Sequence, residues 1–206
     1  MRLILSIFLL CAVVGAGCER KREDRGGQPI RRGDVAEAGE GVIRGRIRFE
    51  GTPPVMKPID KKNSCAHDET PIFEEWAVVG GQGGLANVLV YLQDAPIVGS
   101  PPPQAVVLDQ VNCRYVPRTV GLRVGQILRI KTSDPIPHNV HLRCSVNRTD
   151  NFFLGGPPEF KDRVFDKPEV FHATCDVHPW MSAMIGVFEH PFFAVTAPDG
   201  AFELNG

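Results

Sequence analysis

The chain is built from short runs of strand-forming residues, and no long stretch repeats apolar residues with the 3.6-residue period of a helix. In residues 42–51, VIRGRIRFEG, apolar and charged side chains alternate, which is typical of a strand with one face in water. Gly, Pro, Asp or Asn residues bound the other strand candidates, which are 101–110, 120–134, 138–143, 168–175 and 184–190. Short strands separated by turn signals predict an all-β chain, a Greek-key β-sandwich or barrel.

Three other segments carry more specific expectations. Residues 85–92, LANVLVYL, are apolar throughout, which favours a central strand covered on both faces. Residues 58–76 have room for only a short helix or an irregular excursion. After His190-Pro191, residues 192–204 read as two strands around the turn APDG, so we expect a C-terminal hairpin or the start of a further β-module.

The N-terminal residues indicate export. Residues 1–17 have a positive charge at Arg2, an apolar run and then small residues, as in a signal peptide. Cys18 follows Gly-Ala-Gly in a pattern like a bacterial lipobox, so we expect lipid attachment there, with ordinary cleavage nearby as the alternative. Residues 18–41 are polar and Gly-rich and predict a flexible lipoprotein tether.

Length and charge agree with one folded domain behind that tether. The chain has 206 residues and a formal net charge of −1, so it has no basic excess that would indicate nucleic acid. We expect the main domain to span 42–190, with an N-terminal β extension, and the C-terminal hairpin to span 191–206. Four cysteines follow Cys18, and an oxidising compartment favours pairing, but their positions alone leave three pairings open: Cys65, Cys113, Cys144 and Cys175.

Residues 175–181, CDVHPWM, place a thiol, an imidazole and a thioether at three-residue intervals. Cys175 would end the strand candidate 168–175, and His178 and Met181 would lie on the following loop. A fourth ligand can come from His138, which opens the candidate 138–143 after Pro135 and Pro137. One strand end, one loop and one neighbouring strand can therefore bring four soft donors to a single point.

Two imidazoles, one thiolate and one weak thioether form the ligand set of a blue-copper electron-transfer site. Zinc accepts Cys and His but seldom Met. A catalytic thiol with a histidine base is conceivable, but no oxyanion-stabilising motif stands out. The pattern therefore indicates one type 1 copper ion held by His138, Cys175, His178 and Met181.

IPHNVHL (136–142) and CDVHPWMSAMIGV (175–187) resemble the cupredoxins, the type 1 blue copper family of amicyanin and plastocyanin, and most closely the amicyanin branch. This resemblance implies the same four copper ligands, and it implies that Asn139 ties the His138 segment to the loop after Cys175. The stretch from residue 41 to 92 is similar to larger cupredoxin-like lipoproteins labelled methylamine-utilisation proteins. That second resemblance implies a Cys65–Cys113 disulfide and leaves Cys144 free or buried.

We therefore expect a monomeric, periplasmic, lipid-anchored protein that carries single electrons and is not an enzyme. Its partner would be a redox protein such as a c-type cytochrome or a periplasmic dehydrogenase. His178 would be the exposed ligand, ringed by an apolar docking rim of Pro137, Pro179 and Trp180. Met184 is interpreted as core, although it leaves the choice of axial thioether open. The remaining histidines are interpreted as surface or packing residues: His67, His141, His172 and His190.

Two alternatives belong to other classes of protein. A copper storage or delivery protein would use the same ligands but exchange its metal readily. A structural β-sandwich lipoprotein would pair Cys144 with Cys175 and so have no free thiolate for a metal.

Overall fold

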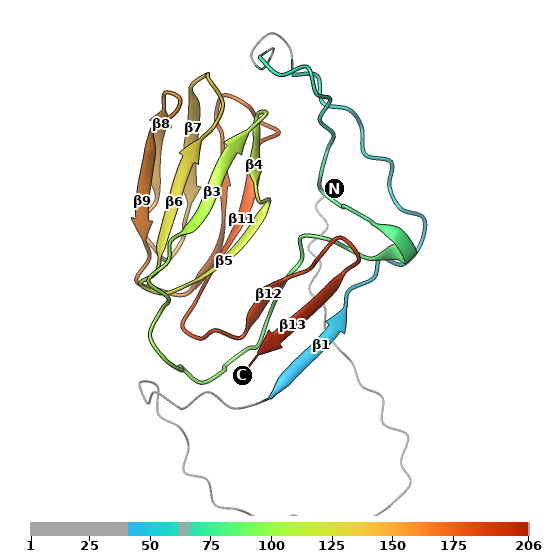
Figure 1. Ribbon diagram of the computed structural model, residues 1–206, viewed down its shortest axis with the longest axis vertical. Coiled ribbons are helices and arrows are strands. Elements are labelled where there is room, and N and C mark those ends of the chain that lie inside the picture. The colour runs from blue at the N-terminus through green and yellow to red at the C-terminus, as the bar shows by residue number, and fades with distance from the viewer. Residues whose placement is uncertain (1–40, 62–64, 66, 206) are drawn as a thin grey trace, which may run out of the picture. The chain divides into compact units, whose positions relative to one another are not determined.

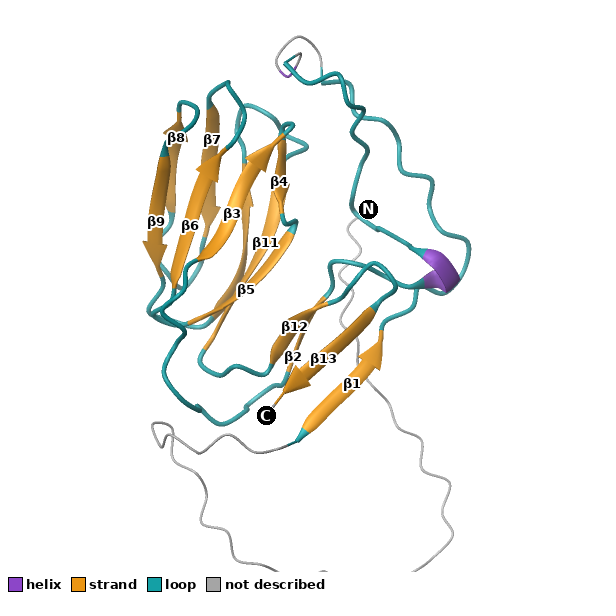
Figure 2. Ribbon diagram, in the orientation of Figure 1, coloured by secondary structure: helices purple, strands orange, loops and turns teal. Residues whose placement is uncertain are grey.

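The computed structural model describes residues 41–61, 65 and 67–205. Strands form nearly all of the regular structure in this part of the chain, and the helix η2 (Gly81–Gly83) is a single 3₁₀ turn (Figure 2). The expected signal peptide 1–17, Cys18 and all but the last residue of the 18–41 tether lie outside the described residues. None of the helical structure in the described segments has the length and apolar character needed to cross a membrane.

Two sheets form the main body (Figure 1). The larger has the order β5-β11-β10-β7-β8 and contains β5 (Thr119–Arg123), β7 (His138–Arg143), β8 (Asp150–Leu154), β10 (Glu169–Thr174) and β11 (Ser182–Phe188). The smaller has the order β4-β3-β6-β9 and contains β3 (Val106–Val111), β4 (Arg114–Val116), β6 (Ile127–Thr132) and β9 (Phe160–Val164). Neighbours are antiparallel except β5 with β11 and β3 with β6.

The core lies between the inner faces of these two sheets. Alternate residues of β6, Leu128 and Ile130, are buried, as are Phe171 and Ala173 of β10. This period of two arises because successive side chains of a strand point to opposite faces. The chain crosses between the sheets at several connections, among them β6–β7 and β8–β9, which is the Greek-key pattern of β-sandwiches. The predicted all-β sandwich is thus confirmed.

The apolar run 85–92 is not a central strand, so that prediction was wrong. Only β2 (Leu89–Tyr91) forms there, and it pairs with β12 (Phe193–Val195) in a separate two-stranded ribbon. The ribbon packs on the outer face of the larger sheet, where Gly121 and Gly186 leave room for the side chains of Phe193 and Leu89. The run is apolar because one of its faces covers the sheet.

The C-terminal strands are present, but they do not pair with each other. β12 joins β2, whereas β13 (Ala201–Asn205) pairs with β1 (Val42–Arg46), so the turn at 197–200 links two ribbons. Between β1 and β2 the described residues are mostly irregular. The 58–76 segment is an irregular excursion joined by one bridge between Pro58 and Phe73, with no α-helix in its described residues.

Candidate metal centre

The four predicted ligands come from adjacent strand ends of the larger sheet. His138 is the first residue of β7, Cys175 follows the last residue of β10, and Met181 precedes β11. Because β7 and β10 are antiparallel neighbours, with His141 opposite Thr174, the start of one strand lies beside the end of the other. His178 lies on the loop between β10 and β11, and thus above the same sheet edge.

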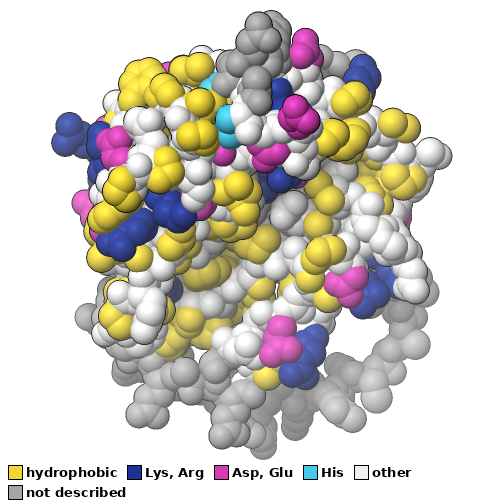
Figure 3. All heavy atoms as spheres, turned by 45° about the horizontal axis from the view of Figure 1, so that its top comes forward, with side chains coloured by type: hydrophobic (Ala, Val, Ile, Leu, Met, Phe, Trp, Pro, Cys, Tyr) yellow, Lys and Arg dark blue, Asp and Glu magenta, His cyan; other side chains and the backbone are white. Residues whose placement is uncertain are grey.

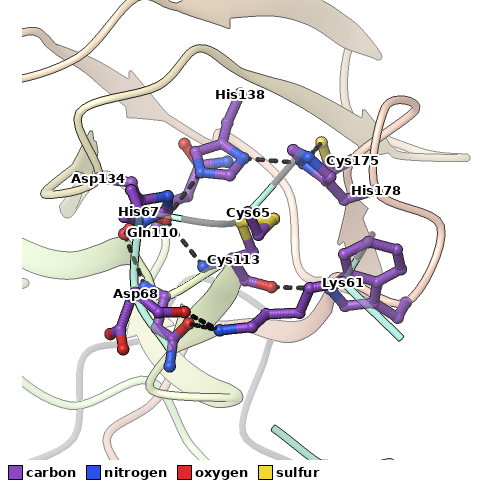
Figure 4. Close-up of a disulfide and its surroundings, with 12 residues drawn as sticks. Lys61, Cys65, His67, Asp68, Gln110, Cys113, Asp134, His138, Cys175 and His178 are labelled. Carbon is purple, nitrogen blue, oxygen red and sulfur yellow. Dashed lines mark hydrogen bonds and ion pairs between the residues drawn. A yellow bond between two sulfur atoms is a disulfide. The ribbon is translucent and has the colours of Figure 1, made fainter. Parts of the chain in front are cut away.

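Three of these donors converge (Figure 4). The Nδ1 atoms of His138 and His178 are 3.0 Å apart, and Cys175 Sγ is 3.6 Å from His178 Nδ1. The three ligand atoms all lie within 4.8 Å of one another. His138 is 0% exposed, Cys175 and His178 are each 2% exposed, and Met181 is 1% exposed. The structure thus brings the two histidines and the cysteine together out of water and buries Met181 in the same core.

These separations suit a shared metal ion. A metal bonded at about 2.0 Å to nitrogen and about 2.3 Å to sulfur, with tetrahedral or trigonal angles, separates two nitrogens by roughly 3.3–3.5 Å and nitrogen from sulfur by roughly 3.5–3.7 Å. The nitrogen–sulfur distance matches, and small ring rotations would widen the 3.0 Å between the nitrogens. Two facing imidazole nitrogens beside a thiol, buried together, are donors that both copper and zinc accept.

Backbone hydrogen bonds close the loop that carries the last three ligands. The N–H of Cys175 donates to the carbonyl of Met181 over 3.2 Å, and the N–H of Met181 donates to the carbonyl of His178 over 2.9 Å. Cys175 and Met181 are therefore held side by side at the two ends of the loop. These two hydrogen bonds hold residues 175–181 in a compact turn.

Asn139 links the two ligand segments in the way that the resemblance implied. Its side-chain oxygen accepts the backbone N–H of Asp176 over 3.0 Å, and its amide nitrogen donates to Asn151 and to the carbonyl of Phe152. Tyr115 adds a second tie, since its hydroxyl contacts the carbonyls of Asn139 and Thr174 at 3.3 and 3.2 Å. The hydrogen bonds of Asn139 and Tyr115 therefore fix the distance between β7 and the end of β10.

Asp134 and His67 belong to the centre although the sequence analysis did not select them. Asp134 Oδ2 lies 2.8 Å from His138 Nε2, which leaves Nδ1 as the inward-facing nitrogen. Asp134 Oδ1 lies 3.1 Å from His67 Nε2 and also accepts the backbone N–H of Asn112, and Oδ2 accepts that of Cys113. His67 is exposed, as expected of a surface residue, but its ring also contacts Asp134. The sequence offered one indication of the contact with His138, which is an aspartate four residues before it.

The protein groups favour a thiolate at position 175. Burial raises the pKa of the Cys175 thiol, but hydrogen bonds with His138 and with backbone groups of His178, Asn139 and Val177 outweigh burial, so the pKa lies below its ordinary value. Burial lowers the pKa of His138, but its bonds to Asp134 and Cys175 raise it above its ordinary value. Burial and the charge of His138 hold the pKa of His178 low. The thiolate is the form of cysteine that binds metals.

His178 is not the exposed ligand that the sequence analysis expected, and that prediction was wrong. Cys65 and Cys113 form a disulfide whose two sulfurs lie within 4.8 Å of a ring nitrogen of His178. Figure 4 shows this disulfide beside the His138–His178 pair. His178 Nε2 is buried and has no hydrogen-bond partner in the described part of the chain. On the face drawn in Figure 3, histidines occupy only small areas among hydrophobic and charged side chains.

The expected docking rim is only partly at the surface. Pro137 and Pro179 are exposed, but Trp180 is half-buried. Its ring lies 5.3 Å from that of His178, centroid to centroid, and its indole N–H donates to the carbonyl of Cys113 over 3.0 Å. Trp180 therefore joins the ligand loop to the disulfide, because the β3–β4 turn that carries Cys113 lies against it.

The remaining candidates lie elsewhere. His141 contacts Asp176, as expected of a satisfied histidine. Met184 is half-buried on the outer face of β11 opposite His172, so its interpretation as core was wrong. Cys144 and Cys175 are both free, so the Cys144–Cys175 pairing of the structural alternative does not form.

No protein-family model matches this chain, and no curated protein matches it either. Among solved structures, it is similar to a copper-containing nitrite reductase from Thermus scotoductus at 19% identity, over 48% of this chain and 25% of that one, with a TM-score of 0.38. This chain thus aligns with about a quarter of the length of that enzyme. An amicyanin from Paracoccus versutus aligns at 18% identity over 48% of this chain and 96% of its own, with a TM-score of 0.37.

A purple cupredoxin from Nitrosopumilus maritimus is also similar, at 20% identity over 40% of this chain and 97% of its own, with a TM-score of 0.34. All three likenesses are partial. The chemistry of the centre therefore has to follow from its own residues.

Proposed function

We propose that this chain is a type 1 copper protein that transfers single electrons between redox partners. The observation that supports this most directly is the convergence of the buried atoms His138 Nδ1, His178 Nδ1 and Cys175 Sγ at one sheet edge. When bound there, copper would alternate between Cu(I) and Cu(II) and so carry one electron. Met181 is the thioether best placed to be the weak axial ligand, since it ends the same loop in the core.

The protein residues would keep the ligands in one arrangement in both oxidation states. Asp134 orients His138, and Asn139 fixes the ligand loop to β7. The sandwich core and the disulfide exclude water from the three donors. A rigid and dry ligand frame lowers the rearrangement that accompanies a change of charge, which favours an electron carrier over an enzyme. The same burial disfavours a storage protein that exchanges its metal readily.

The cellular setting is part of the proposal. We infer export through residues 1–17, lipid attachment at Cys18 and a tether over 18–41, with the protein acting as a monomer in the periplasm. The disulfide supports an oxidising compartment. The partner would be a c-type cytochrome or a periplasmic dehydrogenase that meets the apolar surface around Pro137 and Pro179 in brief encounters.

Copper loading followed by visible spectroscopy tests the proposal. The wild-type protein should show an intense blue band from the thiolate–copper bond, and Cys175→Ser should show none. Cys144→Ser is the matched control, because Cys144 is also free but lies away from the centre, and it should keep the band. A copper-loaded wild-type protein without the band would refute the type 1 assignment.

The axial ligand needs a separate comparison. Met181→Leu should keep the blue colour and raise the reduction potential, because the oxidised ion loses a donor. Met184→Leu should leave the potential unchanged, since Met184 points to the outer face of the sheet. Voltammetry of both variants decides between them, and a shift found only in Met184→Leu would reverse the assignment.

A further inference from the structure

A buried centre raises the question of how copper reaches it. The three converging donors are at most 2% exposed, and the disulfide lies beside His178. Met181, however, lines a surface cavity of about 250 Å³ together with Trp180. The side of Met181 therefore offers a route of approach to the centre.

That cavity adjoins a second one of about 360 Å³ on the outer face of the larger sheet. Both are lined by Glu75, Trp76, Arg118 and Ser182, so they form neighbouring parts of one groove. The second cavity is lined by His172 and Met184 as well. The groove thus has an imidazole and a thioether in one part and Met181 in the other.

His172 and Met184 are directly opposite each other on the antiparallel strands β10 and β11. Both point outward, since their neighbours Phe171, Ala173 and Ile185 are buried. Directly opposite residues on one face of a sheet have Cβ atoms about 4.5–5.5 Å apart, which lets two long side chains bind one ion. The ring of His172 has no hydrogen-bond partner among the described residues, and burial and Arg118 lower its pKa, so the neutral, metal-binding form prevails at neutral pH.

The chemistry of the pair selects a soft monovalent ion. Thioether sulfur favours Cu(I), and imidazole accepts it. Trp76 lines the same cavity and is 62% exposed, so its ring is available to a cation at the groove. Arg118 and Arg114 oppose a cation, but Glu75, which lies 4.0 Å from Arg118 and 3.0 Å from Arg114, and Glu74 line the first cavity with them and offset their charges.

We propose that His172 and Met184 form a surface Cu(I) site that receives the ion and passes it along the groove lined by Trp76 to Met181 and the centre. Its destination rests on the proposed function. The donor would be a soluble Cu(I)–thiol complex, whose thiol is released as the imidazole and thioether bind. The transfer exchanges ligands and leaves the metal as Cu(I), so no electron is gained or lost. On arrival, any proton still on Cys175 passes to water.

Ag(I), which binds like Cu(I) without redox chemistry, tests the surface site. In the protein labelled with ¹³C at its methionine methyl groups, Ag(I) should shift the Met184 signal and leave that of Met56, which lines neither cavity, unchanged. His172→Gln should weaken the response of Met184 by about tenfold in Ag(I) concentration, the effect of losing a ligand worth about 1.4 kcal/mol. A Met184 signal that stays in place while that of Met181 moves would overturn the proposal.

Loading kinetics test the transfer. With a Cu(I)–glutathione complex as donor, followed by oxidation, the blue band should form several-fold more slowly in Met184→Leu than in wild type and reach the same final spectrum. Met56→Leu should load at the wild-type rate. Equal loading rates in wild type, Met184→Leu and Met56→Leu would refute the proposed loading route. A wild-type protein whose Met184 responds to Ag(I) but which never turns blue would instead refute the electron-carrier function and support the surface site alone.

Discussion

At the scale of single residues, Asp134 supports both the candidate metal centre and a neighbouring turn, although it lies outside the predicted ligand set. One of its carboxylate oxygens meets His138 and the backbone N–H of Cys113, and the other meets His67 and the backbone N–H of Asn112. Asn112 and Cys113 form the two-residue turn between β3 and β4, and both have positive φ, as a type I′ turn requires. Asp134 therefore fixes a ligand and the disulfide-bearing turn together.

The substitution Asp134→Asn should be costly. An amide can accept with only one of its two ends, so its NH₂ group would face backbone donors, and the buried His138 would lose its charged partner. We expect the free energy of unfolding to fall by about 3 kcal/mol, as for other broken buried pairs. Urea denaturation of the apo-protein measures this. Asp162→Asn, which removes an exposed partner of Arg129, is the control and should change stability little; an equal loss in both would contradict the role of Asp134.

The sequence predicted the candidate ligands of this centre but not the residues that hold them in place. Cys175, His178 and Met181 are recognisable because one short loop must carry all three, so their spacing reflects their geometry. Asp134 and His67 act through side chains that meet only after the β3–β4 turn, the 58–76 segment and the start of β7 come together. Such contacts depend on tertiary structure and leave no short spacing in the sequence.

At the scale of elements, the irregular segment 58–76 acts as a cover. It places Cys65 beside His178 and His67 against Asp134, and among its described residues one isolated bridge joins Pro58 to Phe73. With so little regular structure of its own, its described part depends on side-chain contacts, of which the disulfide to Cys113 is the strongest. The burial of His178 is therefore a property of this segment as well as of the sandwich.

Removing the disulfide should loosen that cover. Cys65 and Cys113 are 48 residues apart, a separation for which a cross-link contributes about 4 kcal/mol through the unfolded chain. We expect Cys65→Ser with Cys113→Ser to lower the free energy of unfolding by about 2–4 kcal/mol and to speed copper removal by a chelator. Cys144→Ser is the control. Unchanged chelation rates would show that the disulfide does not close the centre.

A second element-scale prediction concerns the loop between β7 and β8. Glu169, at the start of β10, accepts backbone N–H groups of Ser145, Val146 and Asn147. Burial raises its pKa, but these bonds lower it more, from 4.5 to about 2. Because the folded-state pKa is depressed, the stabilisation is present above pH 4.5 and is lost as the pH falls from 4.5 towards 2.

Glu169→Gln should therefore flatten this part of the stability profile. After allowance for partial exposure, we expect a loss of roughly 1–2 kcal/mol at pH 7 that shrinks as the pH approaches 2. Thermal or urea denaturation from pH 7 down to pH 2 measures it. Glu50→Gln, at an exposed position, should keep the wild-type profile. A constant difference at every pH would rule out the titration of Glu169 as its cause.

The strands differ in how far the sequence revealed them. Those of the core, such as β6 and β10, were predictable because one buried face gives a period of two. The run at 85–92 was wrongly predicted to be a central strand because a segment that packs on the face of a sheet can be as apolar as a strand inside the sheet. β9 has no buried residue and β4 is three residues long, so neither carries a hydrophobic pattern that the sequence analysis could detect.

At the scale of the whole molecule, the sandwich and the covering segment 58–76 have different roles in the proposed copper centre. The sheets bring β7, β10 and β11 to one edge, which defines the ligand geometry, and the cover from earlier in the chain closes it against water. A closed centre suits a carrier that keeps its metal. Because neither His138 nor His178 is exposed, a redox partner would have to exchange electrons across the protein that covers the centre. Electron transfer should therefore depend on close docking, and hence on where the protein is held.

Cys18 would determine that location. If it carries the lipid, the full chain expressed with its own N-terminus should be recovered in the membrane fraction, and Cys18→Ala should move the blue protein to the soluble periplasmic fraction without changing its spectrum, because the acyl chains supply the membrane affinity. Cys11→Ala is the matched control, since Cys11 lies within the expected signal peptide and should leave the fractionation unchanged. Immunoblots of the fractions, with visible spectra of each, measure both properties. If Cys18→Ala stays with the membrane, residues 19–41 or another surface must hold the protein there, and the tether would be more than a spacer.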